Sequence, residues 1–284
     1  MTGAAPAAPA APPAPAQPAA GPRWTGFGNL LLAEWTKIRS VRSTVWSLVL
    51  LVVLTVGFTS LLMALTVASW NKGAPAAHAQ LAADPVSAIL GSGNEFGQLT
   101  ICVLGVLVIS SEYSTGVIRA SLLAVPRRIP MLAAKAIVFA ALVFVIGEIV
   151  SFVSFFIGQA ILHSHVTVSL SDPGVTRAVI GEGLYLTVLG LFAMAIGALV
   201  RHTAGGITGV IGFVLVLAPL AQLLPGNYGK YTYAYLPSTA GRLIAQANQL
   251  PGNVLSPWQG FGIFCAWTAA LLIAAGYILY RRDA

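Results

Sequence analysis

The chain alternates between long apolar runs and short polar segments, and this alternation predicts its architecture. Six runs are long enough for helices that cross a bilayer, whose hydrocarbon core requires about 20 helical residues. They lie near Val45–Ala68, Phe96–Ser110, Met131–Ile161, Ala178–Val200, Ala204–Leu224 and Phe261–Tyr280. The second run is short unless it begins near Gly91. We therefore predict an all-α, polytopic integral membrane protein with six transmembrane helices.

Two segments precede the first run. Residues 2–22 consist almost entirely of Ala, Pro, Gly and Gln, so we expect residues 1–26 to form a disordered tail and 27–284 the transmembrane domain. Phe27–Arg42 has helical periodicity and predicts an interfacial helix. Its apolar side carries Phe27, Leu31, Trp35, Ile38 and Val41. Glu34 falls within that stripe, so we expect its carboxylate to meet Lys37 or a protein surface.

The composition supports a membrane protein. The chain is 57% hydrophobic and 8% charged, whereas soluble domains are about 25% charged. The net charge of +7 does not indicate a nucleic-acid partner, because the cations lie in short loops between apolar runs and form no basic patch. Cys102 and Cys265 each lie within an apolar run without a CxxC neighbour, which favours free buried thiols.

The distribution of cations predicts the orientation. If the N-terminus is cytoplasmic, 11 of the 15 lysines and arginines lie on the cytoplasmic side or at its edge. The remaining four lie outside: Lys72, Arg177, Lys230 and Arg242. Because cytoplasmic loops are enriched in lysine and arginine, we predict that both termini are cytoplasmic.

The segment Ser110–Pro130, SSEYSTGVIRASLLAVPRRIP, is polar and basic between two apolar runs. Ser114 or Thr115 can cap a helix there, and Pro126 ends it. One face of that helix is apolar, and three arginines accompany it: Arg119, Arg127 and Arg128. Such an amphipathic segment either docks a partner or lies in the headgroup layer with its arginines on lipid phosphates.

Three motifs in this order resemble the membrane subunits of bacterial ABC exporters of the type 2 permease family. They are EWTKIRS at 34–40, EYSTGVIR at 112–119 followed by PRR at 126–128, and LPSTAG at 236–241. The resemblance implies a homodimeric or heterodimeric six-span pore in the bacterial cell membrane, driven by separate ATPase subunits that bind ATP and Mg. It also implies a set of ATPase-coupling residues: Glu34, Lys37, Arg39, Glu112, Tyr113, Arg119, Arg127 and Arg128.

The chain itself carries no recognisable catalytic motif. A phosphate-binding P-loop requires GxxxxGK followed by Ser or Thr, and the nearest string, at 226–232, lacks that spacing. No nucleophile with a base and an orienting acid is discernible, so we predict no enzyme and no cofactor in this chain. His163 and His165 with Asp172 form only a weak metal signal, and we predict no metal site.

Glu148 and Glu182 lie within predicted spans, where a carboxyl group is costly and usually faces protein or water. They lie at similar depth from the outer ends of adjacent spans, and Glu95 lies at the outer edge of the second. The three acids are candidates for a substrate path. The alternative is that they hydrogen-bond to neighbouring side chains and serve helix packing.

The sequence leaves three functions open. The first is an exporter permease for an amphipathic drug, peptide or lipid. The second is a stand-alone proton-coupled transporter that uses Glu148 and Glu182, and the third is a non-transporting membrane scaffold. The long outer loop Pro225–Pro257 is either a helix that re-enters the outer leaflet or an amphipathic surface loop.

The predicted orientation can be tested by cysteine labelling from outside the cell. A reagent that cannot cross the membrane should modify cysteines placed at Lys72 and Lys230, and should leave cysteines at Arg128 and Arg201 unmodified. The reverse pattern would show that the termini lie outside.

Overall fold

The computed structural model describes residues 26–116, 128–249 and 252–281. Six helical runs in these ranges are long and apolar enough to span a membrane. They are α2 (Arg42–Ala68), α4 (Pro85–Ser114), α6 (Arg128–Leu162), α7 (Val175–Val200), α8 to α9 (Thr203–Gln222) and α12 (Pro257–Arg281). The prediction of an all-α, polytopic membrane protein is confirmed. The predicted tail, apart from Gly26, lies outside the described residues.

Shorter elements lie at the two ends of these helices. α1 (Phe27–Ser40) precedes α2, and the extended backbone of Val41 separates the two helices. The others are η1 (Trp70–Lys72), α3 (Pro75–Ala83), α10 (Gly226–Tyr235), α11 (Pro237–Arg242) and η3 (Leu243–Ala245).

The fifth spanning run contains a π-helical segment. α8 (Thr203–Ile211) and α9 (Leu217–Gln222) flank η2 (Gly212–Val216), where the N–H of Leu217 bonds to the carbonyl of Gly212, five residues earlier. Pro219 has no N–H to bond the carbonyl four residues before it, so the regular α-helical ladder cannot continue through this turn.

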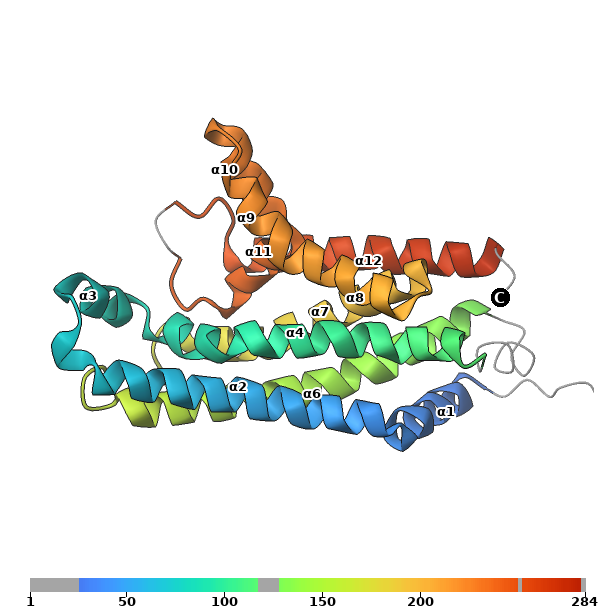
Figure 1. Ribbon diagram of the computed structural model, residues 1–284, viewed down its shortest axis with the longest axis horizontal. Coiled ribbons are helices and arrows are strands. Elements are labelled where there is room, and N and C mark those ends of the chain that lie inside the picture. Colours follow the sequence, from blue (N-terminus) through green and yellow to red (C-terminus); the bar gives the residue numbers. More distant parts are fainter. Residues whose placement is uncertain (1–25, 117–127, 250–251, 282–284) are drawn as a thin grey trace, which may run out of the picture.

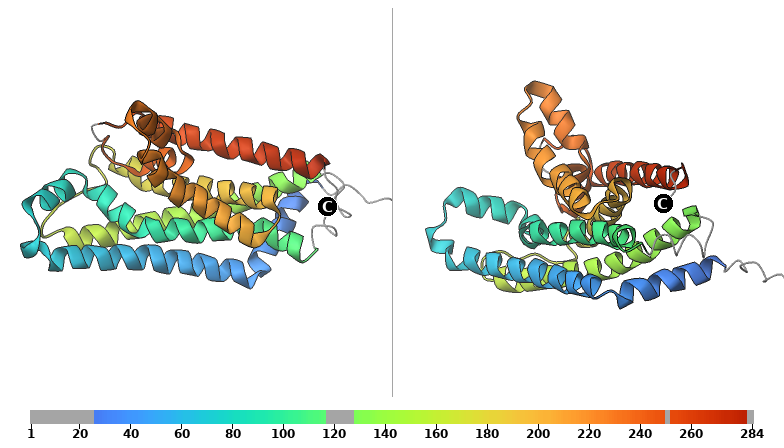
Figure 2. Two further views of the ribbon diagram at one scale, coloured as in Figure 1. Left: turned by 45° about the horizontal axis from the view of Figure 1, so that its top comes forward. Right: turned by 45° about the vertical axis from the view of Figure 1, so that its right-hand side comes forward.

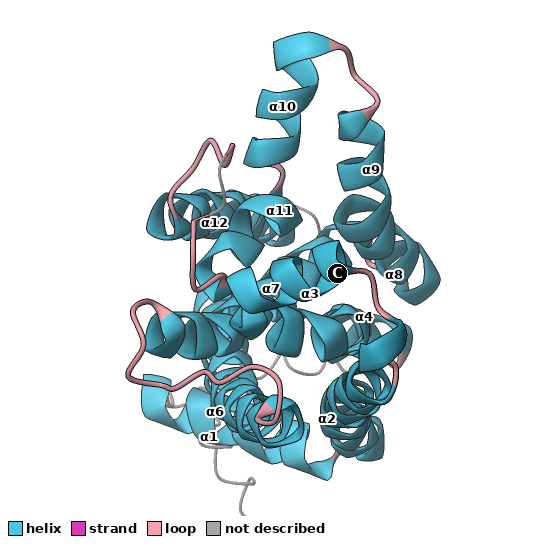
Figure 3. Cartoon of the chain, turned by 90° about the vertical axis from the view of Figure 1, so that its left-hand side faces the viewer, coloured by secondary structure: helices cyan, strands magenta, loops and turns pink. Residues whose placement is uncertain are grey.

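α4 and α7 form the centre of the bundle. In their most apolar windows 61% and 67% of the residues are buried, compared with 22% in α2 and in the fifth run. α2 and α6 lie on one side of this central pair, and α12 with α8 to α11 lies on the other (Figures 1 and 3). α9 and α10 project away from the bundle (Figure 2).

The helices define two ends of the bundle. α1, the end of α4, the start of α6 and the end of α12 lie together at one end, which we call the α1 end (Figure 1). α3 and the start of α4 lie at the other, which we call the α3 end. The chain crosses the bundle six times between α1 and the end of α12. Because this number is even, both lie at the same end.

α4 begins earlier than its apolar run predicted. The apolar run predicted a start at Phe96, or near Gly91 at the earliest, but the helix starts at Pro85. Asp84 is the N-cap: its carboxylate accepts hydrogen bonds from the backbone N–H (3.1 Å) and the hydroxyl (2.6 Å) of Ser87. This cap and a proline at the first helical position favour a helix start that hydropathy alone does not indicate.

The segment from α11 to η3 packs inside the protein, so it is no surface loop. Ala240 and Ile244 are fully buried, and the segment lies against α7 and α12. The guanidinium of Arg177 on α7 donates to the carbonyls of Ile244 (3.3 Å), Gln246 (2.9 Å) and Ala247 (2.9 Å). These bonds satisfy carbonyls that the short helix leaves without partners.

α2 and α4 approach closely at two glycines spaced four residues apart on α4. A Cβ at Gly93 would collide with the carbonyl oxygen of Thr55, and a Cβ at Gly97 would collide with the hydroxyl of Thr55. The rings of Phe58 and Phe96 stack beside this contact with centroids 3.7 Å apart. This is the small-residue spacing that allows close packing of membrane helices.

The contact predicts different effects at two glycines of the same helix. Gly93→Ala should lower the free energy of unfolding by about 1–3 kcal/mol, because the added methyl overpacks the α2–α4 contact. Gly91→Ala is the matched control: no atom lies near its Cβ position, and alanine favours helix by about 0.5–1 kcal/mol. Thermal unfolding in detergent measures both, and equal melting temperatures would contradict the proposed close contact.

Candidate functional site

A buried ion cluster joins three helices at the α1 end. The ammonium of Lys135 on α6 lies 2.5 Å from Oε2 of Glu34 on α1 and 2.8 Å from Oε1 of Glu112 on α4. Lys37 on α1 lies 2.7 Å from Oε1 of Glu34 and 3.4 Å from Oε1 of Glu112. The side chains of Lys135, Glu34 and Glu112 are 2%, 4% and 10% exposed. We call these four residues the ion cluster.

The charges of the ion cluster balance, with two carboxylates and two ammonium groups. Removing a charge from water costs several kcal/mol, so such groups are buried only when each is paired and hydrogen-bonded. Lys135 bridges both carboxylates and thereby holds α1 against the ends of α4 and α6. A lysine within an apolar span is itself a signal for a buried partner, and the charge pattern of the sequence counted Lys135 only among the cations at the cytoplasmic side.

The cluster also decides which face of α1 is buried. The sequence predicted an apolar side with Phe27 and Trp35, and treated Glu34 as an exception. In the structure Leu30, Glu34 and Ile38 are buried, whereas Phe27 and Trp35 are 40% and 44% exposed. Glu34 turns toward Lys135 because a carboxylate gains more from a buried cation than from water at the helix surface.

Lys37 holds its proton more tightly than an isolated lysine. Burial lowers the pKa of Lys37, but the hydrogen bond to Glu34 and the charges of Glu112 and Glu34 outweigh burial and raise the pKa above its ordinary 10.5. The charge of Lys37 therefore stabilises the fold at every pH below its ordinary pKa. That stabilisation is lost only as the pH rises through the raised value.

The remaining coupling candidates lie around the ion cluster or outside the described residues. Tyr113 ends α4 with Arg201 stacked over its ring, 5.3 Å from the ring centroid. Arg39 is exposed in the last turn of α1. Arg128 begins α6, and its side chain is not described. Arg119 and Arg127, with the predicted amphipathic helix, lie outside the described residues.

A second polar cluster lies toward the α3 end. Glu95 on α4 forms an ion pair with Arg242 on α11 and accepts a hydrogen bond from the amide of Gln98 at 2.6 Å. Gln98 in turn accepts a hydrogen bond from the hydroxyl of Tyr185 on α7 at 3.0 Å. The charge pattern of the sequence predicts Arg242 outside the membrane, and no local signal indicates its partner on α4.

Glu148 and Glu182 lie in different surroundings. The carboxylate of Glu148 on α6 lies against Gly183, where a Cβ would come within 2.5 Å of its Oε1. Glu182 on α7 is 4% exposed and lines a cavity together with Asn94 and Arg242. Of the three acids assigned to a substrate path, Glu95 thus has a cationic partner, and Glu182 faces the cavity.

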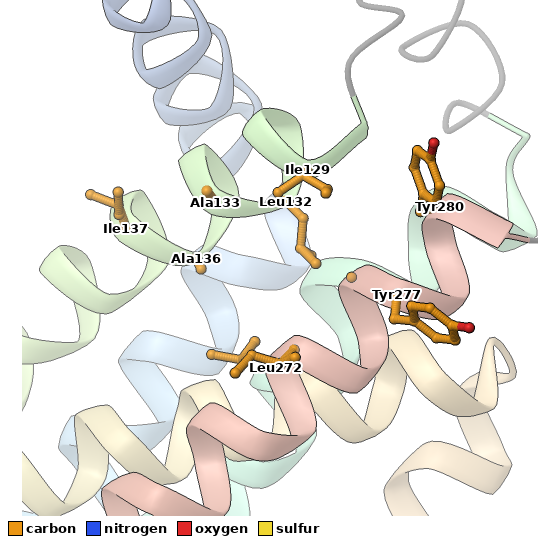
Figure 4. A pocket seen from close by; sticks show the side chains of 10 residues that line it. Ile129, Leu132, Ala133, Ala136, Ile137, Leu272, Tyr277 and Tyr280 are labelled. Atoms are coloured by element: carbon orange, nitrogen blue, oxygen red, sulfur yellow. The ribbon is translucent and has the colours of Figure 1, made fainter.

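An apolar cleft of about 620 Å³ lies between α6 and α12 near the α1 end (Figure 4). Ile129, Leu132 and Leu272 line it, with Tyr277 and Tyr280 at its edge. Ligand sites combine an apolar lining with a few polar groups that orient the ligand. This cleft offers almost no polar groups. We therefore place the candidate site at the two polar clusters.

His78 and His165 stack on a tryptophan ring, whereas Nδ1 of His163 lies 2.8 Å from the carbonyl oxygen of Ala160. The ring of Trp70 lies between His78 and His165, with centroids 4.2 Å from each. Asp172 accepts a hydrogen bond from the backbone N–H of Ser169 at 2.8 Å. In the described part of the chain no three His, Cys, Asp or Glu residues gather in a way that could hold a metal ion.

Comparison with known proteins does not assign the chain to a family. No protein-family model matches the chain. No curated protein matches it either. The resemblance to exporter permeases therefore depends on the three motifs quoted above.

The ion cluster predicts a rescue between two substitutions. Lys135→Met leaves two buried carboxylates facing one lysine and should lower the free energy of unfolding by about 3–5 kcal/mol. Adding Glu112→Gln restores a one-to-one balance between Glu34 and Lys37, so the double variant should melt above the single variant. Lys72→Met at an exposed site is the control. Thermal unfolding in detergent measures all three, and a double variant that melts below Lys135→Met would contradict the charge-balance argument.

Proposed function

We propose that this chain is the membrane subunit of an ATP-driven exporter of the type 2 ABC permease family, working as a dimer with separate ATPase subunits. The observation that carries the proposal is the ion cluster, which fastens α1 to the ends of α4 and α6. The segment with EYSTGVIR and PRR connects those same two helices. Glu34 and Lys37 of the first motif and Glu112 of the second therefore meet at the α1 end.

This arrangement suits the transmission of force. A partner that moves α1 must also move α4 and α6, because separating them would leave buried charges unpaired. α4 and α7 form the centre of the bundle, so a displacement of α4 reaches most of the other helices. In this proposal ATP and Mg bind to the partner, and this chain converts a push on α1 into a tilt of its spans.

The packing of the bundle favours a path between two subunits. α4 and α7 form the buried centre of the single chain, and the cavity beside them, about 160 Å³, is smaller than a drug-sized ligand requires. α2 and the fifth run are largely exposed within the chain, so lipid or a second subunit covers them in a membrane. We propose that the translocation path lies between two permease subunits in the bacterial cell membrane, with both termini cytoplasmic.

One observation favours an alternative. Glu182 has a buried carboxyl oxygen without a hydrogen-bond partner among the described residues, and proton-coupled transporters use such intramembrane acids. In that case the chain would transport by itself along a proton gradient. Reconstitution in liposomes separates the two: transport without any ATPase would select the proton-coupled transporter.

The exposed face of α1 is the proposed surface that docks the ATPase. Substitutions at two exposed tryptophans, one on α1 and one on α2, test this proposal. Trp35 on α1 is 44% exposed and Trp46 on α2 is 72% exposed. Trp35→Ala should weaken binding to the cognate ATPase by roughly tenfold or more, since buried interface tryptophans often contribute about 2 kcal/mol. Trp46→Ala should bind the ATPase with the same affinity as the wild-type chain.

The measurement is co-purification of the tagged permease with the ATPase, followed by titration of the purified partners. Both variants should melt at the temperature of the unchanged chain, because neither residue belongs to the ion cluster. Equal binding by the two variants would show that α1 is not the docking surface. If the wild-type chain binds no ATPase, the proposed function is wrong.

A further inference from the structure

The apolar cleft between α6 and α12 is open on the outside of the bundle (Figure 4). The side chains of Ile129, Ile137 and Ile273 line it and are exposed, so they face away from the protein core. The two helices come together beneath them, where a Cβ at Gly276 would lie 3.9 Å from Cδ2 of Leu132. The cleft is therefore a groove between two spans whose open side faces the surroundings of the bundle, which for membrane spans is lipid.

The length of the cleft matches the acyl region of one leaflet. Its lining on α12 extends from Leu272 to Tyr280, about 12 Å at 1.5 Å per residue. Each leaflet contributes about 15 Å to a hydrocarbon core about 30 Å thick. Tyr277 and Tyr280 are exposed near the end of α12, and tyrosines are enriched at the level of the lipid headgroups. The cleft thus runs from the headgroup level into the hydrocarbon.

A cation lies at the headgroup end of the cleft. The guanidinium carbon of Arg281 is 5.0 Å from the ring centroid of Tyr277, which lines the cleft. Arg281 is exposed and forms no ion pair with another described residue. Arg128 begins α6 directly before Ile129, so the lining has an arginine next to it in the sequence on both helices.

The acids near this end do not offset that charge. No carboxylate lines the cleft. Glu34 and Glu112, which also lie at the α1 end, are paired with Lys135. The sequence next to Ile129 and Tyr280 has four arginines and one acid: Arg127, Arg128, Arg281, Arg282 and Asp283. The headgroup end of the cleft therefore has more cations than anions.

We infer that the cleft binds an anionic phospholipid, with an acyl chain along the apolar lining and the phosphate at Arg281 and the start of α6. An acyl chain needs no polar partner, so the lack of polar groups in the lining suits it. The volume of about 620 Å³ lies within the 300–1,000 Å³ of sites for small molecules.

Two features distinguish this cleft from the exposed apolar faces that any membrane protein presents to lipid. It is concave, and it ends at unpaired positive charge. Basic side chains between spans on the cytoplasmic side recognise anionic headgroups, and the α1 end is the predicted cytoplasmic end. The inference goes beyond the proposed function, because lipid binding here needs no ATPase.

Binding can be measured on the purified subunit in a neutral detergent. The probes are dioleoylphosphatidylglycerol and dioleoylphosphatidylcholine, which share their acyl chains and differ in net charge, and inorganic phosphate. Native mass spectrometry counts bound lipid, and a bound ligand raises the melting temperature. The wild-type chain should bind the glycerol lipid at least about fivefold more tightly than the choline lipid, since one basic residue near a headgroup contributes about that factor. Phosphate should not raise the melting temperature.

Two pairs of variants separate the headgroup from the acyl chain. Arg281→Gln should weaken binding of the glycerol lipid by about fivefold and change binding of the choline lipid by less than about twofold. Arg42→Gln is its control, because Arg42 is exposed at the start of α2 and does not line the cleft. Ala136→Phe places a ring in the cleft and should weaken binding of both lipids by roughly tenfold. Ala141→Phe adds the same ring at an exposed position of α6 outside the lining and should not weaken it.

Four outcomes would overturn the inference. They are equal binding of the two lipids by the wild-type chain, a rise in melting temperature with phosphate alone, equal losses in Arg281→Gln and Arg42→Gln, and lipid binding unchanged by a folded Ala136→Phe. If Ala136→Phe also lowers the fraction of dimers without lowering bound lipid, a second copy of the chain occupies the cleft. The comparison at Arg281 holds even if Ala136→Phe does not fold, because Arg281 is exposed.

The result is independent of the proposed function. Selective lipid binding by a subunit that binds no ATPase would support the lipid site and overturn the exporter proposal. ATPase binding without lipid selectivity would do the opposite.

Discussion

The fold depends on one constraint: charged groups buried in an apolar bundle must find partners on other helices. The ion cluster meets this constraint at the α1 end, where Lys135 bridges Glu34 and Glu112. At the α3 end the partly exposed side chains of Arg242 and Glu95 form an ion pair. The pairs Glu34–Lys135 and Glu95–Arg242 join helices that are distant in the sequence, so the pairing helps to decide which helices lie together and in which rotation. Apolar packing alone specifies this weakly, because many rotations bury similar areas.

The two polar clusters divide the bundle into regions with different chemistry. The cluster near α1 is balanced in charge, and Lys135 bridges its two carboxylates, which suits a mechanical joint between α1, α4 and α6, although Oε2 of Glu112 has no donor among the described residues. The cluster near α3 includes Glu182 and Asn94, each with an oxygen that lacks a donor in the described residues. Unsatisfied groups of that kind are costly for stability and mark places where a ligand or a proton can bind.

α4 connects these regions. Its last turn carries Glu112, and its first half carries Asn94 and Glu95. A helix transmits axial displacement because its backbone hydrogen bonds are satisfied within the segment and resist bending. In the proposed mechanism, movement of α1 would thus reach the α3 end of the bundle through α4. α2 contacts α4 closely at Gly93.

The sequence determined the six apolar helices, since hydropathy over about 20 residues is a local property. It also indicated that Glu34 needed a partner. It did not determine the start of α4, which depends on the Asp84 cap, or the buried face of α1, which depends on Lys135. Glu95 lies 147 residues from Arg242, and Glu34 lies 101 residues from Lys135, and no local pattern encodes such pairs. Only the tertiary structure decided them, because a buried charge selects its partner from whatever the packing brings within reach.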